Sequence, residues 1–355
     1  MTVMVTGIGH VGGYVVRDLL AAGEDVVLFG FFGGSGDPSD TFPPDLQFVD
    51  QLVGGDLRDR VKIIVGDIAD LDAITCTAEQ FGVSKIVHLA SLLSAGVEKN
   101  PPLAARVNVV GTANVFEAAA RLQMPRVVWA SSVDVFGDKS ADEFGIVRDD
   151  SPYDPPFIYG ATKVLGEQMA LRYAENHALN LSGLRLTRAY GFGEHIKAGR
   201  GGGSSWMSGM LYEPAVASGR EVVVPFGARY CDFLYMEDVA RAFTKALDSK
   251  TTGSHNYIIG GDYRLISEAF DFVAKLFPEA PLKLVMEDGL LPPGSSLAWE
   301  RRYDGTRAGN ELGYTSKYNL EQGLLLTINN NRASVGLPPI AMPELSIRER
   351  QLEEA

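Results

Sequence analysis

The stretch "VTGIGHVGG", Val5 to Gly13, decides the fold, because it joins an apolar strand pattern to a helical pattern through closely spaced glycines. Gly7, Gly9 and Gly12 have the spacing G-x-G-x-x-G. This spacing allows a tight turn, close approach of the backbone to a pyrophosphate, and close packing of helix against strand. Free N–H groups at the start of the helix would face the anion. A glycine-rich turn without a ligand is the alternative, but strand, turn and helix in this order favour a dinucleotide site.

The succession of strand and helix continues along the first half of the chain. Runs of Val, Ile and Leu predict strands that are buried on both faces, as in parallel sheets. The segment 104–122 has apolar residues at helical spacing. We therefore predict an α/β fold with a doubly wound parallel sheet of the Rossmann type and a smaller C-terminal substrate-binding region. The predicted strands are Thr2–Gly7, Asp25–Gly30, Val61–Asp67, Lys85–Ser91 and Arg126–Ser132.

Composition narrows the class of partner. The chain has 355 residues and a net charge of −13, and its Lys and Arg do not form a basic stripe, so nucleic acid is not expected as a partner. The sequence contains no run of about 18 apolar residues, so no membrane span is expected. The two cysteines, Cys76 and Cys231, form neither a disulfide framework nor a metal site, which suits a cytoplasmic protein without a metal.

The end of the second predicted strand departs from the usual pattern of NAD sites. An acid at this position binds the ribose hydroxyls in many such proteins. Here the residue is Gly30, and only Asp37 and Asp40 in the following loop could reach back. No Lys or Arg stands between Arg17 and Arg58 to hold a 2′-phosphate. We expect NAD as the cofactor, with NADP left open.

A Ser, Tyr and Lys set predicts the chemistry. Tyr159 and Lys163 in "YGATK" are four residues apart at the start of a predicted helix, and Ser132 ends the fifth strand, at the edge of the sheet where ligands bind. A lysine ammonium nearby favours the phenolate and lowers the pKa of the tyrosine. The serine hydroxyl can orient a substrate oxygen. An exposed Tyr and a solvated Lys would be the alternative for the pair alone.

With these residues, the chain resembles the extended short-chain dehydrogenase/reductase family, which includes the NAD-dependent epimerases and dehydratases. The resemblance runs from Thr2 to about Leu247 through "VGDI", "VHLAS", "VNVVGT", "ASSVDVFG", "YGATK", "LRLTRAYGFG" and "CDFLYMEDVA". It implies that Tyr159 is the general acid or base, with Lys163 as its partner and Ser132 as hydroxyl donor. The cofactor-binding residues that it implies are Gly7, Gly9, His10, Val11, Gly12, Asp67, Ile68, Leu89, Ala90, Ser91, Asn108, Tyr159, Lys163 and Leu186.

Several positions depart from the family pattern. The glycine turn is one residue shorter than T-G-x-x-G-x-x-G, and the Asp-Glu pair of the dehydratases is replaced by Val133-Asp134. Asp134 contacts substrate or only caps a turn. The arginine that grips the diphosphate in sugar-nucleotide members is replaced by Cys231, and an Asn common in the family by Arg188. We expect substrate to meet Ser132, Asp134, Arg188 and Cys231; Arg188, Arg301 or Arg302 could supply another anion site, or they are surface or structural arginines.

Two functions follow from the resemblance. The first is an NAD(P)-dependent dehydrogenase or reductase that acts on a secondary alcohol or ketone of a small hydroxylated substrate. The second is a sugar-nucleotide epimerase with tightly bound NAD. Residues 1–188, with 232–262, are expected to form the cofactor domain, and 189–231 with 263–355 the substrate-binding region. The family also implies a homodimer, through the helices near 107–122 and 160–176.

Overall fold

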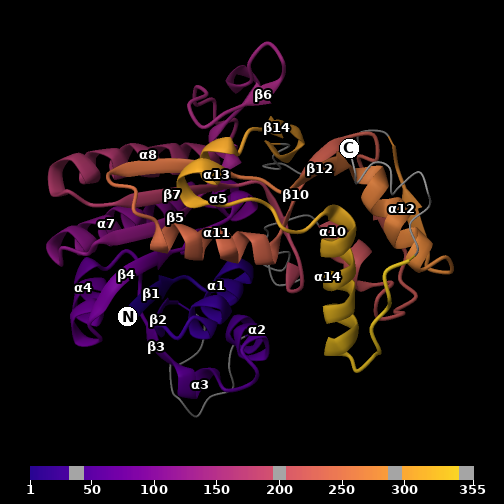
Figure 1. The fold of residues 1–355 in the computed structure, drawn as a ribbon, viewed down its shortest axis with the longest axis horizontal. Helices are drawn as coiled ribbons and strands as arrows, with labels where there is room; N and C mark the ends of the chain where they lie inside the picture. The colour runs from indigo at the N-terminus through magenta and orange to yellow at the C-terminus, as the bar shows by residue number, and fades with distance from the viewer. Residues whose placement is uncertain (32–43, 195–204, 287–297, 344–355) are drawn as a thin grey trace.

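A seven-stranded parallel sheet forms the centre of the protein, in the order β11-β7-β5-β4-β1-β2-β3. The computed structural model describes residues 1–31, 44–194, 205–286 and 298–343 (Figure 1). The order and direction of the strands confirm the predicted doubly wound α/β class. The strands are β1 (Thr2–Thr6), β2 (Asp25–Gly30), β3 (Val61–Val65), β4 (Val83–His88), β5 (Arg126–Ser132), β7 (Leu181–Leu186) and β11 (Ser254–Ile259).

Helices cover both faces of this sheet (Figure 1). Alternate residues of β1 point to opposite faces, so Val3 and Val5 belong to one apolar cluster and Met4 to another. The first cluster packs α1 (His10–Ala21), α2 (Pro44–Leu52) and α11 (Met236–Asp248) on the sheet. The second packs α4 (Leu71–Gln80), α7 (Gly111–Arg121) and α8 (Ile158–His177) on the other face. The short α3 (Leu57–Arg60), α5 (Ser94–Lys99) and α6 (Pro101–Ala104) connect these elements.

A second region lies beside the sheet, on the right of Figure 1, around its own apolar cluster. In it, β10 pairs with β8 in parallel and with β12 in antiparallel direction, and β9 pairs with β13. Its strands are β8 (Arg188–Tyr190), β9 (Val222–Val224), β10 (Tyr230–Tyr235), β12 (Asp262–Leu265) and β13 (Leu282–Leu284), and its helices are α10 (Ser205–Tyr212), α12 (Ile266–Leu276) and α14 (Leu320–Ser334).

The C-terminal third also reaches the segment that follows the fifth strand of the chain. The pairing of β6 (Ile146–Val147) with β14 (Arg302–Tyr303) brings η4 (Ala298–Glu300) against η2 (Val133–Val135). Apolar side chains of both segments share one cluster. The turn η3 (Asp138–Ser140) and the helix α13 (Thr306–Leu312) also belong to the described elements. Residues that come directly after Ser132 are therefore covered by distant parts of the chain.

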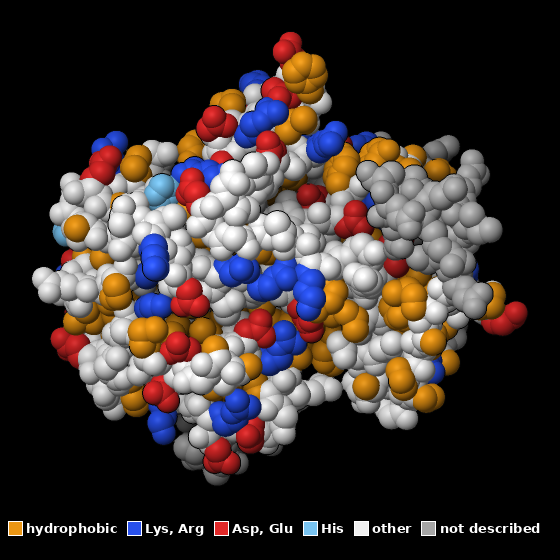
Figure 2. Space-filling model, viewed as in Figure 1, with side chains coloured by type: hydrophobic (Ala, Val, Ile, Leu, Met, Phe, Trp, Pro, Cys, Tyr) orange, Lys and Arg blue, Asp and Glu red, His pale blue; other side chains and the backbone are white. Residues whose placement is uncertain are grey.

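Charges of both signs are mixed on the face drawn in Figure 2, where Lys and Arg lie among Asp and Glu over α11. Arg17 pairs with Glu237 at 3.1 Å, and Arg241 pairs with Asp238 at 2.5 Å. No helix in the described part of the chain is long and apolar enough to cross a membrane. Among the described residues, no cluster of three or more His, Cys, Asp or Glu could hold a metal ion.

Candidate active site

The turn between β1 and α1 requires glycine at two of the predicted positions. Gly7 has φ +79°, and a Cβ placed on it would lie 2.5 Å from the Cα of Ala90. A Cβ on Gly12 would lie 2.9 Å from the carbonyl oxygen of Gly7. Gly9 stands at the N-cap of α1 and, because it has no side chain, cannot cap the first turn. The turn therefore leaves backbone N–H groups at the start of α1 without a side-chain cap, as an anion site needs.

The side chain of His10 is turned into the protein. Its Nε2 lies 2.9 Å from the carbonyl oxygen of Phe192, and its Nδ1 lies 3.5 Å from the carboxylate of Glu194. The ring is 4% exposed, so contact with a cofactor would come from the backbone of His10. Val11 packs partly buried against the first apolar cluster. Thus the helix that begins the cofactor turn is tied to the chain that follows β8.

The residues predicted near the adenine and ribose lie at the same edge of the sheet. Asp67 is exposed, accepts the N–H of Ala69 at 2.9 Å, and forms an ion pair with Arg106. Ile68 is buried, and the N–H of Leu89 donates to Thr6 at 2.8 Å. Ala90 lies against the glycine turn. Ser91 follows β4 and Leu186 is the last residue of β7, and both are part-buried.

Gly30 is the last residue of β2, so this strand end carries no acid. The carbonyl of Gly30 accepts the N–H of Gly66 at 3.0 Å, and Gly30 is buried. Asp37 and Asp40, which the sequence offered as replacements, lie outside the described residues.

Asn108 holds the loop after β4 from within a π-helical segment, η1 (Ala105–Val110). Its side-chain oxygen accepts the N–H of Leu92 at 2.7 Å, and its Nδ2 donates to the carbonyl of Leu92 at 3.1 Å. The same Nδ2 lies 3.4 Å from the hydroxyl of Thr162 on α8. Asn108 therefore connects the predicted cofactor loop to the helix that carries Tyr159 and Lys163.

The structure brings Tyr159, Lys163 and Ser132 together at the end of β5. The ammonium of Lys163 donates to the carbonyl of Ala130 at 2.9 Å and lies 5.5 Å from the centre of the Tyr159 ring. The Ser132 hydroxyl lies near enough to the phenol of Tyr159 to lower the pKa of the tyrosine. Lys163 is 6% exposed, and this burial lowers its pKa to about 8, while Glu167 acts in the opposite direction. At neutral pH the lysine is mostly charged.

The pKa of Tyr159 departs from the expectation. Burial raises it above the ordinary value of a tyrosine, and the negative charge of Asp134 raises it further, whereas the hydrogen bond from Ser132 lowers it. We expected the nearby lysine to lower this pKa, but burial instead raises it. Tyr159 is therefore protonated at neutral pH and poised to donate a proton.

Asp134 lies inside the turn η2, which Ser132 caps, and its negative charge acts on Tyr159. The N–H of Asp134 donates to the Ser132 hydroxyl at 3.1 Å, and the Ser132 hydroxyl donates to the Asp134 carboxylate, also at 3.1 Å. Because a serine hydroxyl has one proton, Ser132 can donate either to Asp134 or toward a ligand at a given moment. Of the two roles that the sequence left open for Asp134, the cap of the turn belongs to Ser132, and contact with substrate stays a prediction.

The arginines considered for an anion site are all engaged with acids of this chain or exposed. Arg188 is buried and pairs with Glu194 at 2.5 Å, and Arg229 contacts both oxygens of Glu300, the nearer at 2.6 Å. The side chain of Cys231 is buried in the apolar cluster of the second region. In the C-terminal segment, Arg301 pairs with Asp138 at 2.6 Å and Arg302 is exposed on β14.

Sequence reasoning did not find His88, which lies beneath the site. Its two ring nitrogens lie 2.7 Å from the Thr6 hydroxyl and 3.0 Å from the Thr112 hydroxyl. Burial, together with the charge of Lys163, lowers the pKa of His88 to about 3, so its ring is neutral. His88 could have been identified from the strand register, which places it beside Thr6. That register is known only once β1 and β4 are known to be neighbours.

Comparison with known proteins identifies the class. The sequence profile of the NAD dependent epimerase/dehydratase family matches residues 3–260, and the chain belongs to this family. Among curated relatives, it is 28% identical over 265 residues to UDP-glucuronate 4-epimerase 4 of Arabidopsis thaliana, a match that covers 72% of this chain and 56% of that protein.

Solved structures agree with this class. MoeE5, crystallised in complex with UDP-glucuronic acid and NAD, is 26% identical, with a TM-score of 0.72 and coverage of 94% of this chain and 100% of that one. L-threonine 3-dehydrogenase of Trypanosoma brucei shares the fold at a TM-score of 0.74 and 22% identity, over 95% of this chain and 99% of that one. The fold thus occurs in a protein named as a dehydrogenase as well as in proteins named as epimerases.

Proposed function

We propose that the protein is an NAD(P)-dependent oxidoreductase of the extended short-chain type, which moves a hydride between the nicotinamide and a secondary alcohol or ketone of a small hydroxylated substrate. The observation that carries the proposal is the group formed by Ser132, Tyr159 and Lys163 at the rim of the sheet. Ligands bind at this rim in doubly wound folds, and the glycine turn of β1 ends on the same rim.

The residues present fit NAD. A Cβ on Gly7 or on Gly12 would meet backbone atoms, so the turn has the close backbone approach that a dinucleotide uses. The N–H groups at the start of α1 could hold the pyrophosphate, and Asp67, Leu89 and Ser91 could meet the adenosine half and the linking phosphates. MoeE5, at 26% identity, was crystallised with NAD. NAD would supply the hydride acceptor or donor.

The protein's own part of the reaction is proton transfer and orientation. In the direction of reduction, Tyr159 donates its phenolic proton to the substrate carbonyl oxygen as the hydride arrives at the carbon, so that an alcohol forms. The hydroxyl of Ser132 donates a hydrogen bond to the same oxygen. The ammonium of Lys163 faces the ring of Tyr159 and stabilises the phenolate that remains. In the direction of oxidation the same groups act in reverse.

The substrate side supports a small substrate over a diphosphate. A diphosphate is usually held by arginines, which bind its oxygens through two donors. In the described part of the chain, Arg188, Arg229 and Arg301 each pair with an acid of this protein. Opening the pairs of Arg188 and Arg229 to bind phosphate would break ion pairs of a buried and a half-buried carboxylate. The pair of Arg301 with the exposed Asp138 would open at little cost.

A second candidate is a sugar-nucleotide epimerase with tightly bound NAD. Two comparisons favour it, because the Arabidopsis relative is named UDP-glucuronate 4-epimerase 4 and MoeE5 was crystallised with UDP-glucuronic acid. The same Tyr159 and Lys163 would serve, and the hydride would return to the opposite face of the sugar. NAD would then remain bound through purification.

The experiment that tests the proposal separates the two candidates. Purified protein is offered polyols, hydroxy acids and aryl alcohols with NAD, and the nicotinamide absorbance is followed. Turnover that is lost in Tyr159→Phe by roughly 10²- to 10⁴-fold, with NAD affinity unchanged, would support the oxidoreductase. Absence of turnover with every alcohol, together with a rise of the melting temperature with UDP-sugars, would favour the epimerase instead.

We also infer the organisation of the protein in solution. Residues 1–188 with 232–262 are assigned to the cofactor domain, and 189–231 with 263–355 to the substrate-binding region. A cytoplasmic homodimer is proposed through η1, α7 and α8, since Val110, Leu165 and Leu171 are exposed apolar residues of these helices. Sedimentation of the purified chain would test the dimer.

A further inference from the structure

Two side chains on one face of α8 hold consecutive residues of β5. Lys163 donates to the carbonyl of Ala130 at 2.9 Å, and the hydroxyl of Ser131 donates to Glu167 at 2.6 Å. Lys163 and Glu167 are four residues apart, so they lie one helical turn from each other. The next residue of β5 is Ser132. The strand end that presents Ser132 is therefore fastened to the helix that presents Tyr159 and Lys163.

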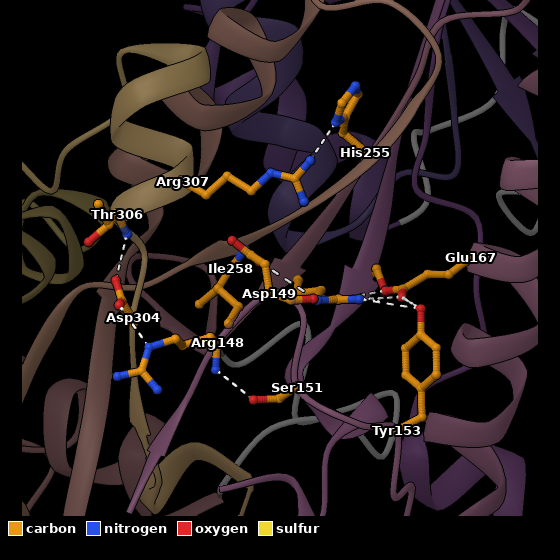
Figure 3. Close-up of polar contacts among 12 residues, drawn as sticks. Arg148, Asp149, Ser151, Tyr153, Glu167, His255, Ile258, Asp304, Thr306 and Arg307 are labelled. Carbon is orange, nitrogen blue, oxygen red and sulfur yellow. Dashed lines mark hydrogen bonds and ion pairs between the residues drawn. The ribbon is translucent and has the colours of Figure 1, made fainter. Parts of the chain in front are cut away.

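The carboxylate of Glu167 is fully buried and fully used. One oxygen accepts from Ser131 and from Nε of Arg185 at 2.9 Å, and the other accepts from Tyr153 at 2.7 Å and from Nη2 of Arg185 at 2.6 Å. Figure 3 shows the Glu167 carboxylate meeting the hydroxyl of Tyr153. Such a two-point contact between an arginine and a carboxylate fixes both groups in orientation.

Arg185 is itself held in place from several elements. Its Nη1 donates to the carbonyl of Asp149 at 2.7 Å, and its guanidinium lies 4.8 Å from the centre of the Phe136 ring. The carboxylate of Asp149 accepts the N–H of Ile258 on β11 at 2.7 Å (Figure 3). In the sheet, Arg185 stands beside Ser131. The network thus joins β5, β7, β11 and α8 behind the site.

Few charges act on Lys163. Glu167 comes from the same helix, and its charge raises the pKa of the lysine. His88 faces Lys163 from β4 but is neutral, because its pKa is about 3. Tyr159 is protonated, and Asp134 lies near Tyr159. Arg185 pairs with Glu167 at 2.6 Å.

We propose that Glu167 is a positioning residue for the reaction: it fixes the end of β5 through Ser131, and its negative charge keeps the buried ammonium of Lys163 in place beside Tyr159. The proposal rests on the function proposed above. Glu167 acts through Ser131 and Lys163 rather than on substrate. Arg185 pairs with this buried carboxylate, and burying a carboxylate without a partner would be costly.

The test measures the ionisation of Lys163 directly and needs no substrate. In protein labelled with ¹³C at the lysine Cε, one resonance should titrate near pH 8, far below ordinary lysines, and it should vanish in Lys163→Arg. The double variant Glu167→Leu with Arg185→Met removes both charges and leaves apolar groups, an exchange that buried ion pairs often tolerate. Glu175→Gln, at an exposed position of the same helix, is the control.

We expect the Lys163 titration to move to lower pH by at least about half a unit in the double variant and to stay in place in Glu175→Gln. A folded double variant whose Lys163 titrates as in the wild type would overturn the proposal. This outcome is independent of whether a substrate has been found, so it is distinct from failure of the proposed oxidoreductase.

Should the double variant not fold, Ser131→Ala tests the same carboxylate and leaves the ion pair intact. With a turned-over substrate, we expect kcat to fall about tenfold while KM and NAD affinity stay the same, because the orientation of Ser132 is lost. Ser131→Thr, which keeps the hydroxyl, should restore kcat. A kcat of Ser131→Ala equal to that of the wild type would refute the positioning role.

Discussion

The cofactor side and the substrate side of the site use their polar groups differently. Around the glycine turn, the groups that could meet a ligand belong to the backbone, and the contacts depend on residues without a Cβ, such as Gly7 and Gly12. On the other side, long charged side chains meet one another, as Arg188 meets Glu194. The difference teaches that a motif of small residues can be checked against the backbone itself, whereas a motif of charged residues does not show whether the charge faces a ligand or a partner in the chain.

The largest effect is expected on the cofactor side, at Gly7. Gly7→Ala puts a Cβ 2.5 Å from backbone atoms of Ala90 at a positive φ, so something must shift. We expect a loss of about 3 kcal/mol or more in the free energy of unfolding and loss of NAD binding, measured by denaturation and calorimetry. Gly23→Ala is the matched control, since Gly23 has the same φ of +79° and no neighbour within 4 Å. It should cost only about 1 kcal/mol; equal losses would show that the close approach to Ala90 is unimportant.

On the substrate side, Arg188→Met should break the ion pair between Arg188 and the buried Glu194. We expect the free energy of unfolding to fall by about 3–5 kcal/mol. The double variant Arg188→Met with Glu194→Leu should recover most of this loss, and a thermal melt would show it. A double variant that folds but no longer binds substrate would assign Arg188 to the ligand after all and would break the comparison drawn above.

Asp134 lies where the two sides meet, and its charge raises the pKa of Tyr159. Asp134→Asn removes a negative charge that disfavours the phenolate, so the pKa of Tyr159 should fall. The rate of alcohol oxidation, which needs Tyr159 to accept a proton, should therefore reach its plateau at lower pH than in the wild type. A pH profile that keeps its position, or moves to higher pH, would contradict this electrostatic role.

The smallest effect is expected at Gly30. Gly30→Asp introduces a carboxylate at the end of β2, where it would accept hydrogen bonds from ribose hydroxyls and repel a 2′-phosphate. The ratio of NADP to NAD affinity should fall several-fold, about 1 kcal/mol, as measured by titration with both cofactors. An unchanged ratio would mean that this strand end does not lie at the ribose.

Much of the cofactor side could be predicted from the sequence because each feature there is local. The turn follows from three glycines, and the rim position of Ser132 follows from an uninterrupted apolar strand. The partners of Arg188 and Arg229 could not be predicted, because Glu194 and Glu300 reach them only through tertiary folding. The same holds for the raised pKa of Tyr159, which depends on burial by segments distant in sequence.

The role of Glu167 lies between these cases. Its spacing from Lys163 is visible in "KVLGE", but spacing alone suggests a surface ion pair within a helix. In the structure both side chains are buried, and each makes a hydrogen bond to a different residue of β5. Helical periodicity therefore identified the face, and only the packing of α8 on the sheet identified the contacts.

The π-helical segment that carries Asn108 makes the site sensitive to chain length. Residues 101–121 form one continuous helix in which six residues have the wider turn. Removing one residue from that turn would let it close to an ordinary α-helical turn, which shifts the side chains within the turn while the flanking helices keep their orientation. Asn108 would then no longer face Leu92 while α7 kept its place on the sheet. Insertions and deletions in this helix are therefore a separate route, beside substitution, by which the loop at the cofactor rim could be reshaped.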